Sequence, residues 1–365
     1  MFRRDLHRHP EVSGTEARTA SRVASALSVI GGWEVRGGIG GHGVLATRVI
    51  DPSGPALLLR ADMDALPIQE EGDDRPHRSV HDGVAHLCGH DGHTTMLLAA
   101  AERIAEDPPS TGTVHLIFQP AEETGQGARA ILADDGFPSG IDRAVALHNI
   151  PGVQRGTVVV GPGSFTHAVR STVYTLIGRT AHAGESANGL HPGPAAGRLL
   201  QVLGREASGP GRAVTVVHAV VGDAAYGTAP GRAEVHVTAR STDDADLDAL
   251  EEELDTTVRT ICREAGLSLD LQRREHFAAC HNDPDVVEAI RRAARAAGAP
   301  VEERRDPFRW GEDFGFFTQH IPGALFGLGA GIDHPSLHTG TYDFPDDLID
   351  PGARILHAIV HETLH

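Results

Sequence analysis

The chain has 365 residues, of which 40% are hydrophobic and 22% charged, proportions typical of a globular protein. The 50 acidic and 32 basic residues give a formal net charge of −18, which argues against nucleic acid as a partner because phosphate binding needs a basic surface. No stretch is apolar enough for a membrane span, and the 3 cysteines are too few for a disulfide framework, so we expect a cytoplasmic protein.

Two features of the composition bear on chemistry. The sequence contains no lysine, which excludes a catalytic lysine and a Schiff base. It contains 23 histidines, more than packing needs, and histidine is the commonest metal ligand and a frequent acid–base group. The positions of the histidines are therefore informative.

The first half of the chain alternates helical patterns with short, nearly continuous apolar runs. Such runs predict a sheet buried on both faces, and their alternation with helices predicts a mostly parallel mixed sheet. Ser13 and Glu16 fit a capping box at the start of the first helix. The predicted elements are a helix at 13–30, strands at 43–50 and 56–60, a helix at 94–106, strands at 113–118 and 144–147, and a late strand at 324–328.

The pattern changes between residues 168 and 278. The order strand, helix, strand, strand, helix, strand is that of a ferredoxin-like unit. Its predicted elements are strand 169–177, helix 192–206, strands 213–221 and 233–239, helix 244–264 and strand 268–275. Asp283 and Pro284 then open a new helix, with Asp as N-cap. We therefore expect an α/β domain formed by residues 1–167 and 279–365, interrupted by a smaller α+β domain at 168–278.

Side chains of the types that commonly bind metal ions flank several of these elements. They are Asp62 and Asp64 after strand 56–60, Glu122 and Glu123 after strand 113–118, His148 after strand 144–147, and Cys88 and His90 before helix 94–106. Each alone has an ordinary explanation: an Asp caps a helix, adjacent Glu residues are solvated, and a Cys packs as a small buried residue. Their joint position favours a metal site, because ligands gather beyond the carboxyl ends of strands in open α/β sheets.

The same segments carry a family resemblance. The chain resembles the aminoacylase and glutamate-carboxypeptidase superfamily of metal-dependent amidases, within the amidohydrolase branch of hippurate and auxin-conjugate hydrolases. CGHDGHT at 88–94 and QPAEE at 119–123 are highly specific for this branch. The other matching segments are LHRHPEVSGTE (6–16), RADMDALPIQE (60–70), LHNIPG (147–152), GRTAHAG (178–184), GEDFGFF (311–317) and LHTGTYDFPDD (337–347).

This resemblance implies a metal-binding domain interrupted by a lid that also forms a homodimer contact. The implied ligands of two divalent ions are Cys88, His90, Glu123, His148 and His338. Glu122 would be the catalytic carboxylate, Asp62 and Asp64 would support the ligands, and His182 would stabilise the oxyanion. A Cys thiolate favours zinc over magnesium, while manganese, cobalt and nickel remain possible.

Simple chemistry gives Glu122 a role distinct from that of Glu123. We expect adjacent side chains to point apart, so that Glu122 does not bind the ion held by Glu123. It can instead take a proton from water and pass it to the leaving nitrogen, as a general base and then a general acid.

The leading prediction is hydrolysis of an N-acyl amino acid or related conjugate into a carboxylic acid and an amino acid. A dipeptidase or a deacetylase of an N-acetyl amino-acid intermediate is the nearest alternative, and a non-catalytic metal- or ligand-binding protein is another. The substrate carboxylate needs a cation, for which Arg240 and Arg232 are candidates. Gly227 stands where the branch usually has a substrate-binding Asn, which leaves the details of substrate binding open.

Overall fold

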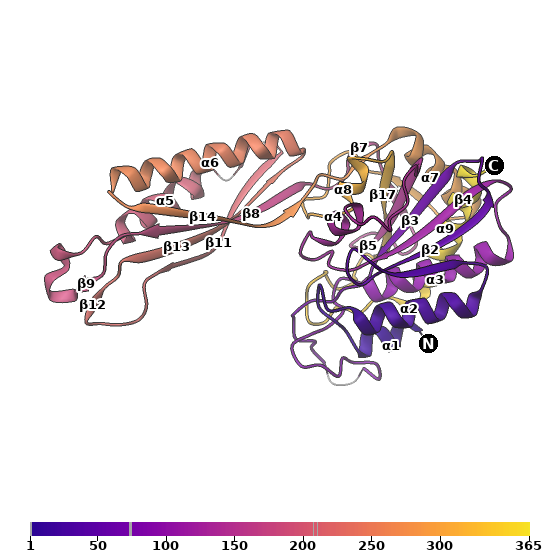
Figure 1. Cartoon of the computed structure of the whole chain (residues 1–365), viewed down its shortest axis with the longest axis horizontal. Helices are drawn as coiled ribbons and strands as arrows, with labels where there is room; N and C mark the ends of the chain where they lie inside the picture. The colour runs from indigo at the N-terminus through magenta and orange to yellow at the C-terminus, as the bar shows by residue number, and fades with distance from the viewer. Residues whose placement is uncertain (1, 73–74, 207, 210) are drawn as a thin grey trace. The chain divides into compact units, whose positions relative to one another are not determined.

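The computed structural model describes residues 2–72, 75–206, 208–209 and 211–365, which form two compact units (Figure 1). Unit 1 comprises Met1–Phe165, Cys280–Pro307 and Glu312–His365. Unit 2 comprises Thr166–Ala279 and Phe308–Gly311. Each unit has its own cluster of buried hydrophobic side chains, so each is described by itself.

Unit 1 is built on a mixed sheet of 8 strands in the order β1-β2-β4-β3-β5-β17-β6-β16. Neighbours are parallel at β4/β3, β3/β5, β5/β17 and β6/β16 and antiparallel at the other three pairings. The strands are β1 (Glu34–Ile39), β2 (Gly43–Asp51), β3 (Ala56–Asp62), β4 (Gly112–Gln119), β5 (Arg143–Pro151), β6 (Val158–Val160), β16 (Val301–Glu303) and β17 (Gly323–Gly331). The mixed sheet predicted from the apolar runs is confirmed.

Seven helices of unit 1 accompany this sheet in the described chain. Buried side chains of α3 and α9 pack with those of the central strands in one hydrophobic core. The helices are α1 (Phe2–Arg8), α2 (Ala17–Ile30), α3 (His90–Glu106), α4 (Gly127–Leu132), α7 (Pro284–Ala296), α8 (Gly315–Thr318) and α9 (Ile349–Thr363). Asp283 caps α7 as expected, since its carboxylate accepts from the backbone N–H groups of Asp285 and Val286.

The capping box predicted at the start of helix 13–30 is wrong. Helix α2 begins at Ala17, and its N-cap Glu16 makes no side-chain capping bond. The Ser13 hydroxyl donates instead to Asp64 at 2.6 Å, while Glu16 accepts from the backbone N–H of Ala121 at 2.9 Å. Both side chains are thus hydrogen-bonded to the loops that follow strands β3 and β4. These tertiary contacts take the place of the expected helix cap.

Unit 2 has the element order β8, α5, β11, β13, α6, β14 that the sequence predicts. Its antiparallel sheet of 5 strands runs β10-β11-β13-β8-β14. The bounds are β8 (Ala168–Ile177), α5 (Gly193–Glu206), β10 (Ser208–Gly209), β11 (Arg212–Val221), β13 (Arg232–Ser241), α6 (Asp244–Glu264) and β14 (Ser268–Phe277). Helix α6 buries Leu247, Leu250, Leu254 and Val258 on one face, which explains its strong periodic pattern.

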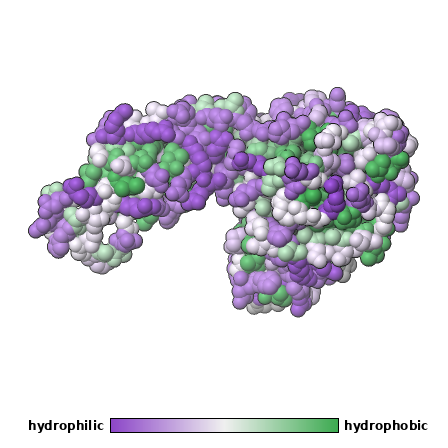
Figure 2. All heavy atoms as spheres, in the orientation of Figure 1, coloured by the Kyte–Doolittle hydropathy of each residue, from purple (hydrophilic) through white to green (hydrophobic). Residues whose placement is uncertain are grey.

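The remaining regular segments are short. Strand β9 (Ala181–His182) pairs with β12 (Thr228–Ala229), and β7 (Gly163–Ser164) pairs with β15 (His281–Asn282). Two 3₁₀ helices lie at Ala183–Asn188 and Asp346–Leu348. Hydrophilic residues cover most of the visible surface of both units, with apolar residues in separate patches (Figure 2). Among the described helices, none has the length and apolar character needed to cross a membrane.

Candidate metal centre

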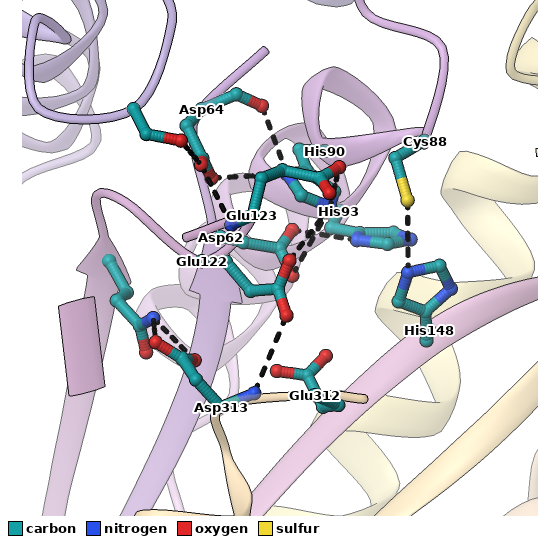
Figure 3. Close-up of polar contacts among 12 residues, drawn as sticks. Asp62, Asp64, Cys88, His90, His93, Glu122, Glu123, His148, Glu312 and Asp313 are labelled. Carbon is teal, nitrogen blue, oxygen red and sulfur yellow. Dashed lines mark hydrogen bonds and ion pairs between the residues drawn. The ribbon is translucent and has the colours of Figure 1, made fainter. Parts of the chain in front are cut away.

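Four of the five residues predicted to bind metal, Cys88, His90, Glu123 and His148, meet at one end of the unit 1 sheet (Figure 3), and the fifth, His338, lies beside Glu123. Strand β3 ends at Asp62, and Glu122 and Glu123 lie in the turn that follows β4. His148 lies within β5 rather than after it, because β5 continues its parallel pairing with β17 as far as Pro151. Helix α3 begins at His90, earlier than the expected residue 94.

Gly89 brings the two ligand candidates of the CGH segment into place. Its backbone is left-handed, with φ of 98°. A Cβ added there would lie 2.5 Å from the Asn149 side-chain nitrogen and 2.8 Å from the Tyr342 hydroxyl. Only glycine therefore lets Cys88 and His90 flank this position without displacing the neighbouring residues.

Backbone strain is also concentrated at this site. Ala121 (φ 54°) and His338 (φ 62°) are the non-glycine residues with positive φ in the described part of the chain. Ala121 immediately precedes Glu122, and His338 is itself a predicted ligand. Such conformations persist where the surrounding structure enforces them, and they cluster at functional sites.

The five predicted ligands form two groups that share Cys88. One group consists of Cys88, His90 and His148, and the other of Cys88, Glu123 and His338. Within each group, all the donor atoms lie within 4.8 Å of one another. The Cys88 Sγ lies 3.4 Å from His148 Nε2. Glu123 Oε1 lies 3.7 Å from His90 Nε2 and 3.5 Å from His338 Nε2. The His338 side chain is 49% exposed and forms the open side of the cluster.

Two buried polar atoms in this cluster, His90 Nε2 and Glu123 Oε1, have no hydrogen-bond partner among the described residues. The Nδ1 of His90 donates to the Asp64 carbonyl at 2.9 Å, and that of His148 donates to the Asn149 carbonyl at 2.8 Å. These bonds fix the tautomer in which each Nε2 carries a lone pair toward the cluster. A thiol, three imidazoles and a carboxylate in this arrangement fit divalent ions of the zinc type.

The electrostatics of the cluster favour a bound cation. Burial alone would lower the pKa of His90, but Asp62, Asp64 and Glu123 outweigh it and raise the pKa to about 10. Burial, together with Glu123, raises the pKa of the Cys88 thiol well above its usual value. A metal cation bound beside the sulfur would lower this pKa and favour the thiolate.

Glu122 lies beside the ligands, with Oε2 4.0 Å from His90 Nε2 and Oε1 accepting from the Asp313 backbone N–H at 3.4 Å. The expectation that Glu122 and Glu123 point apart is wrong, because both carboxylates approach His90 Nε2. The two residues lie in a tight turn, closed by a bond from Gly125 N to Glu122 O, and not in extended backbone where side chains alternate. Burial, Glu312 and Glu123 raise the pKa of Glu122 well above its usual value.

Two buried residues that sequence reasoning missed organise the acidic side chains. Arg60 forms ion pairs with Asp62 at 2.7 Å, Glu312 at 3.0 Å and Asp313 at 2.9 Å. His93 Nδ1 donates to Asp62 at 2.7 Å. A single arginine inside the apolar run ALLLR was the available signal for Arg60. His93 was visible only as part of the CGHDGHT motif, and its partner Asp62 lies in another element.

The other predicted site residues belong to unit 2. His182 on β9 pairs with Thr228 on β12, and the Ala183 N–H donates to the Gly227 carbonyl at 2.9 Å. His182 and Gly227 are 45 residues apart in sequence, but His182 lies on β9 and Gly227 directly precedes the neighbouring strand β12. Apart from the adjoining residues, no heavy atom of the described chain lies within 4 Å of a Cβ added at Gly227, so a side chain would fit there.

The two candidate arginines differ in their partners. Arg232 is paired with Glu234, its Nη2 lying 2.6 Å from the carboxylate. Arg240 donates to the Arg309 carbonyl at 2.8 Å and has no ion pair within the described residues. Burial lowers the pKa of the Arg240 guanidinium, although Glu275 opposes this. Arg240 is thus the cation better able to accept an external carboxylate.

Comparison with known proteins places the chain in a family. The profile of Peptidase family M20/M25/M40 matches residues 58–362. The chain belongs to this family. N-acetyl-L-cysteine deacetylase of Bacillus subtilis is 32% identical over 342 residues, covering 92% of this chain and 81% of the relative. A solved dinuclear metal-binding peptidase of the M20 family from Bacillus subtilis is 26% identical and has a TM-score of 0.84, with 100% of this chain and 96% of that chain covered.

A second relative supports the same placement within the family. N-acetylcysteine deacetylase of Bacillus subtilis is 31% identical over 342 residues, covering 90% of this chain and 87% of the relative. The M20 profile spans every site residue discussed above, from Asp62 to His338. The predicted site residues of both units therefore all fall within the segment of the chain that the family profile matches.

Proposed function

We propose that this chain is a metal-dependent amidohydrolase that cleaves the amide bond of an N-acyl amino acid, releasing a carboxylic acid and an amino acid. The observation that carries the proposal is the pair of three-residue ligand groups sharing Cys88, with the Glu122 carboxylate beside them. A solvated surface cluster would not leave His90 Nε2 and Glu123 Oε1 buried without partners. Membership of a peptidase family agrees with amide hydrolysis.

Two divalent ions would be held by Cys88, His90, Glu123, His148 and His338. When bound, such ions polarise a substrate carbonyl and strengthen water as a nucleophile at neutral pH. The thiolate and imidazole donors favour zinc, with manganese, cobalt and nickel as alternatives. The structural neighbour from Bacillus subtilis, described as dinuclear and metal-binding, supports a pair of ions.

Glu122 is the proposed proton carrier. Its carboxylate would take a proton from the attacking water and donate it to the nitrogen of the leaving amino acid, so that the carboxylate is regenerated. The backbone N–H of Asp313 positions one of its oxygens, and the other faces the ligand cluster. Asp64 orients His90 through hydrogen bonds to Nδ1, and Asp62 fixes His93.

Small N-acyl amino acids are the proposed substrate class, supported by a relative named N-acetyl-L-cysteine deacetylase. Arg240 would bind the substrate carboxylate, because Arg232 is already paired with Glu234. His182 would stabilise the oxyanion of the tetrahedral intermediate as a hydrogen-bond donor. Gly227, on the segment next to His182, would leave room for the acyl group or the amino-acid side chain.

We further propose that residues 168–278 form a ferredoxin-like lid that also makes the contact of a homodimer. The element order of unit 2 and its sheet order β11-β13-β8-β14 support the ferredoxin-like part of this proposal. A cytoplasmic location is proposed on the basis of Cys88, Cys262 and Cys280, which are buried and form no disulfide in the described part of the chain.

The test measures metal content and amine release on the same preparation. Metal-replete protein is assayed with N-acetyl amino acids, N-benzoyl amino acids and dipeptides. We expect Glu122→Gln to lower kcat by ~10²–10⁴-fold without changing metal content. The control Glu102→Gln, at an exposed position of α3, should retain full activity. Wild-type activity in Glu122→Gln would refute its role, and a preference for dipeptides would support the alternative substrate class.

A further inference from the structure

A second cluster of metal-binding side chains lies outside the proposed active site. His357 and His361 are four residues apart near the end of α9, so their side chains lie on the same face of the helix. Asp107 is the C-cap residue of α3. Helices α3 and α9 pack against each other in unit 1 (Figure 1), which brings Asp107 to both histidines.

The donor atoms of this cluster have the spacing of a tetrahedral metal site. The two Nε2 atoms lie 3.1 Å apart, and Asp107 Oδ2 lies 3.6 Å from that of His357 and 3.5 Å from that of His361. Ligands bound at ~2.0–2.1 Å with tetrahedral angles stand about 3.3 Å from one another. The three donors thus outline one face of a tetrahedron of nearly the right size.

The direction of the hydrogen bonds in the cluster depends on which ring nitrogens carry protons. Both Nε2 atoms also lie beside the Asp107 carbonyl oxygen, at 3.0 Å for His357 and 3.2 Å for His361. If both imidazoles donate to that carbonyl, their two N–H groups face each other at 3.1 Å. If one donates to the other, the acceptor nitrogen directs no proton at the carbonyl. When both rings carry their proton on Nδ1, the two Nε2 lone pairs and the Asp107 carboxylate are together available to one cation.

We propose that His357, His361 and Asp107 form a peripheral site for one divalent transition-metal ion of the zinc class. Two imidazoles at helical spacing with one carboxylate suit zinc, copper or nickel and not magnesium or calcium, which prefer oxygen ligands. The His357 side chain is 20% exposed and that of His361 37%, so an ion can enter from solvent. The bound ion would connect the last turn of α9 to the end of α3.

The test counts zinc ions in the full chain, equilibrated with buffered free zinc and analysed for metal content. We expect wild-type protein to hold one zinc equivalent more than His357→Ala/His361→Ala, with amide hydrolysis equal in the two. The control His320→Ala, which removes an exposed histidine outside the cluster, should keep the wild-type equivalent.

A second variant guards against effects on folding. Asp107→Asn retains the carbonyl and both imidazoles but removes the anionic ligand, so it should bind the additional zinc more weakly in competition with a chelator. Zinc should also raise the melting temperature of wild type more than that of the double variant. Equal zinc content in wild type and the double variant, with both folded, would overturn the proposal whatever the result for the amidohydrolase.

Discussion

His7 provides a sharp test of the electrostatics of unit 1. This histidine of α1 is fully buried, and its ring contacts Asp91 at 2.9 Å and Glu70 at 3.2 Å. Burial alone would lower the pKa of His7, but the bonds to Asp91 and Glu70 outweigh burial and the opposing charge of Arg3, and the pKa rises to about 9. We predict that His7→Gln destabilises the protein in a manner that depends strongly on pH.

The magnitude follows from the two pKa values of the imidazole. A rise from the ordinary 6.5 to about 9 in the folded protein corresponds to roughly 3 kcal/mol, since one pKa unit is ~1.4 kcal/mol. The folded state binds the proton more tightly, so this stabilisation is fully present below pH 6.5 and is lost as the pH rises through 9. His7→Gln should therefore cost about 3 kcal/mol near pH 6 and little of that near pH 10.

The assay is urea unfolding of wild type and variant at both pH values, followed by circular dichroism. Only the difference between the two proteins at each pH is interpreted, because groups that do not contact His7 titrate equally in both, and Asp91 and Glu70 are carboxylates at both pH values. His9→Gln serves as the control: this ring lies at the end of the same segment, partly exposed and 3.8 Å from Asp5. A loss for His7→Gln that is the same at pH 6 and pH 10 would refute the assigned ionisation.

Three further predictions concern the proposed active site. Cys88→Ser replaces a soft ligand by a hydroxyl and should reduce zinc retained after dialysis ~10-fold or more, as measured by metal analysis. Arg240→Ala should raise KM for N-acyl amino acids by about 10–100-fold, the equivalent of ~1.5–3 kcal/mol for a charged hydrogen bond, whereas Arg232→Ala should leave KM within about twofold; equal effects would contradict the assignment. Gly227→Asn should leave the melting temperature unchanged, since its Cβ has open space, while lowering KM for N-acetyl amino acids; an unchanged KM would count against a substrate contact here.

Periodic apolar patterns were sufficient to predict most of the large elements. The strands at 113–118 and 324–328 correspond to β4 and β17, whose residues are almost all buried, and the strand at 43–50 corresponds to β2, whose first four residues are buried. Helix α6 begins and ends at the predicted residues, since its apolar face and its N-cap Asp243 are both local features. Where an apolar run or an apolar helix face is buried along its length, sequence and structure agree.

Several of the elements that escaped prediction lack such a pattern, although α9, which was also missed, has one, with Ile355, Leu356, Ile359 and Val360 buried on one face. Helix α1 (Phe2–Arg8) is held by buried polar contacts, with Arg3 paired to Asp91 and Asp343. Strand β6 has three residues and β16 has three, too few for a period to show. Helix α3 extends to His90 because Gly89 turns the chain into it, and histidine, aspartate and glycine in its first turn carry no apolar signal.

The site itself was predictable as a set of residues but not as a charge distribution. Arg60 is the one buried guanidinium ion-paired to Asp62, Glu312 and Asp313 in the described chain, yet these three carboxylates outnumber it. Burial and Glu312 outweigh Arg60 and raise the pKa of Asp313 above its ordinary value. Glu122 lies on the side of the same acidic group that faces the ligand cluster. Cations bound to the ligand cluster would therefore neutralise the negative charge that Arg60 alone leaves uncompensated. This excess of carboxylates could not be predicted from the sequence, because it arises only when the fold brings residues from distant strands and loops together.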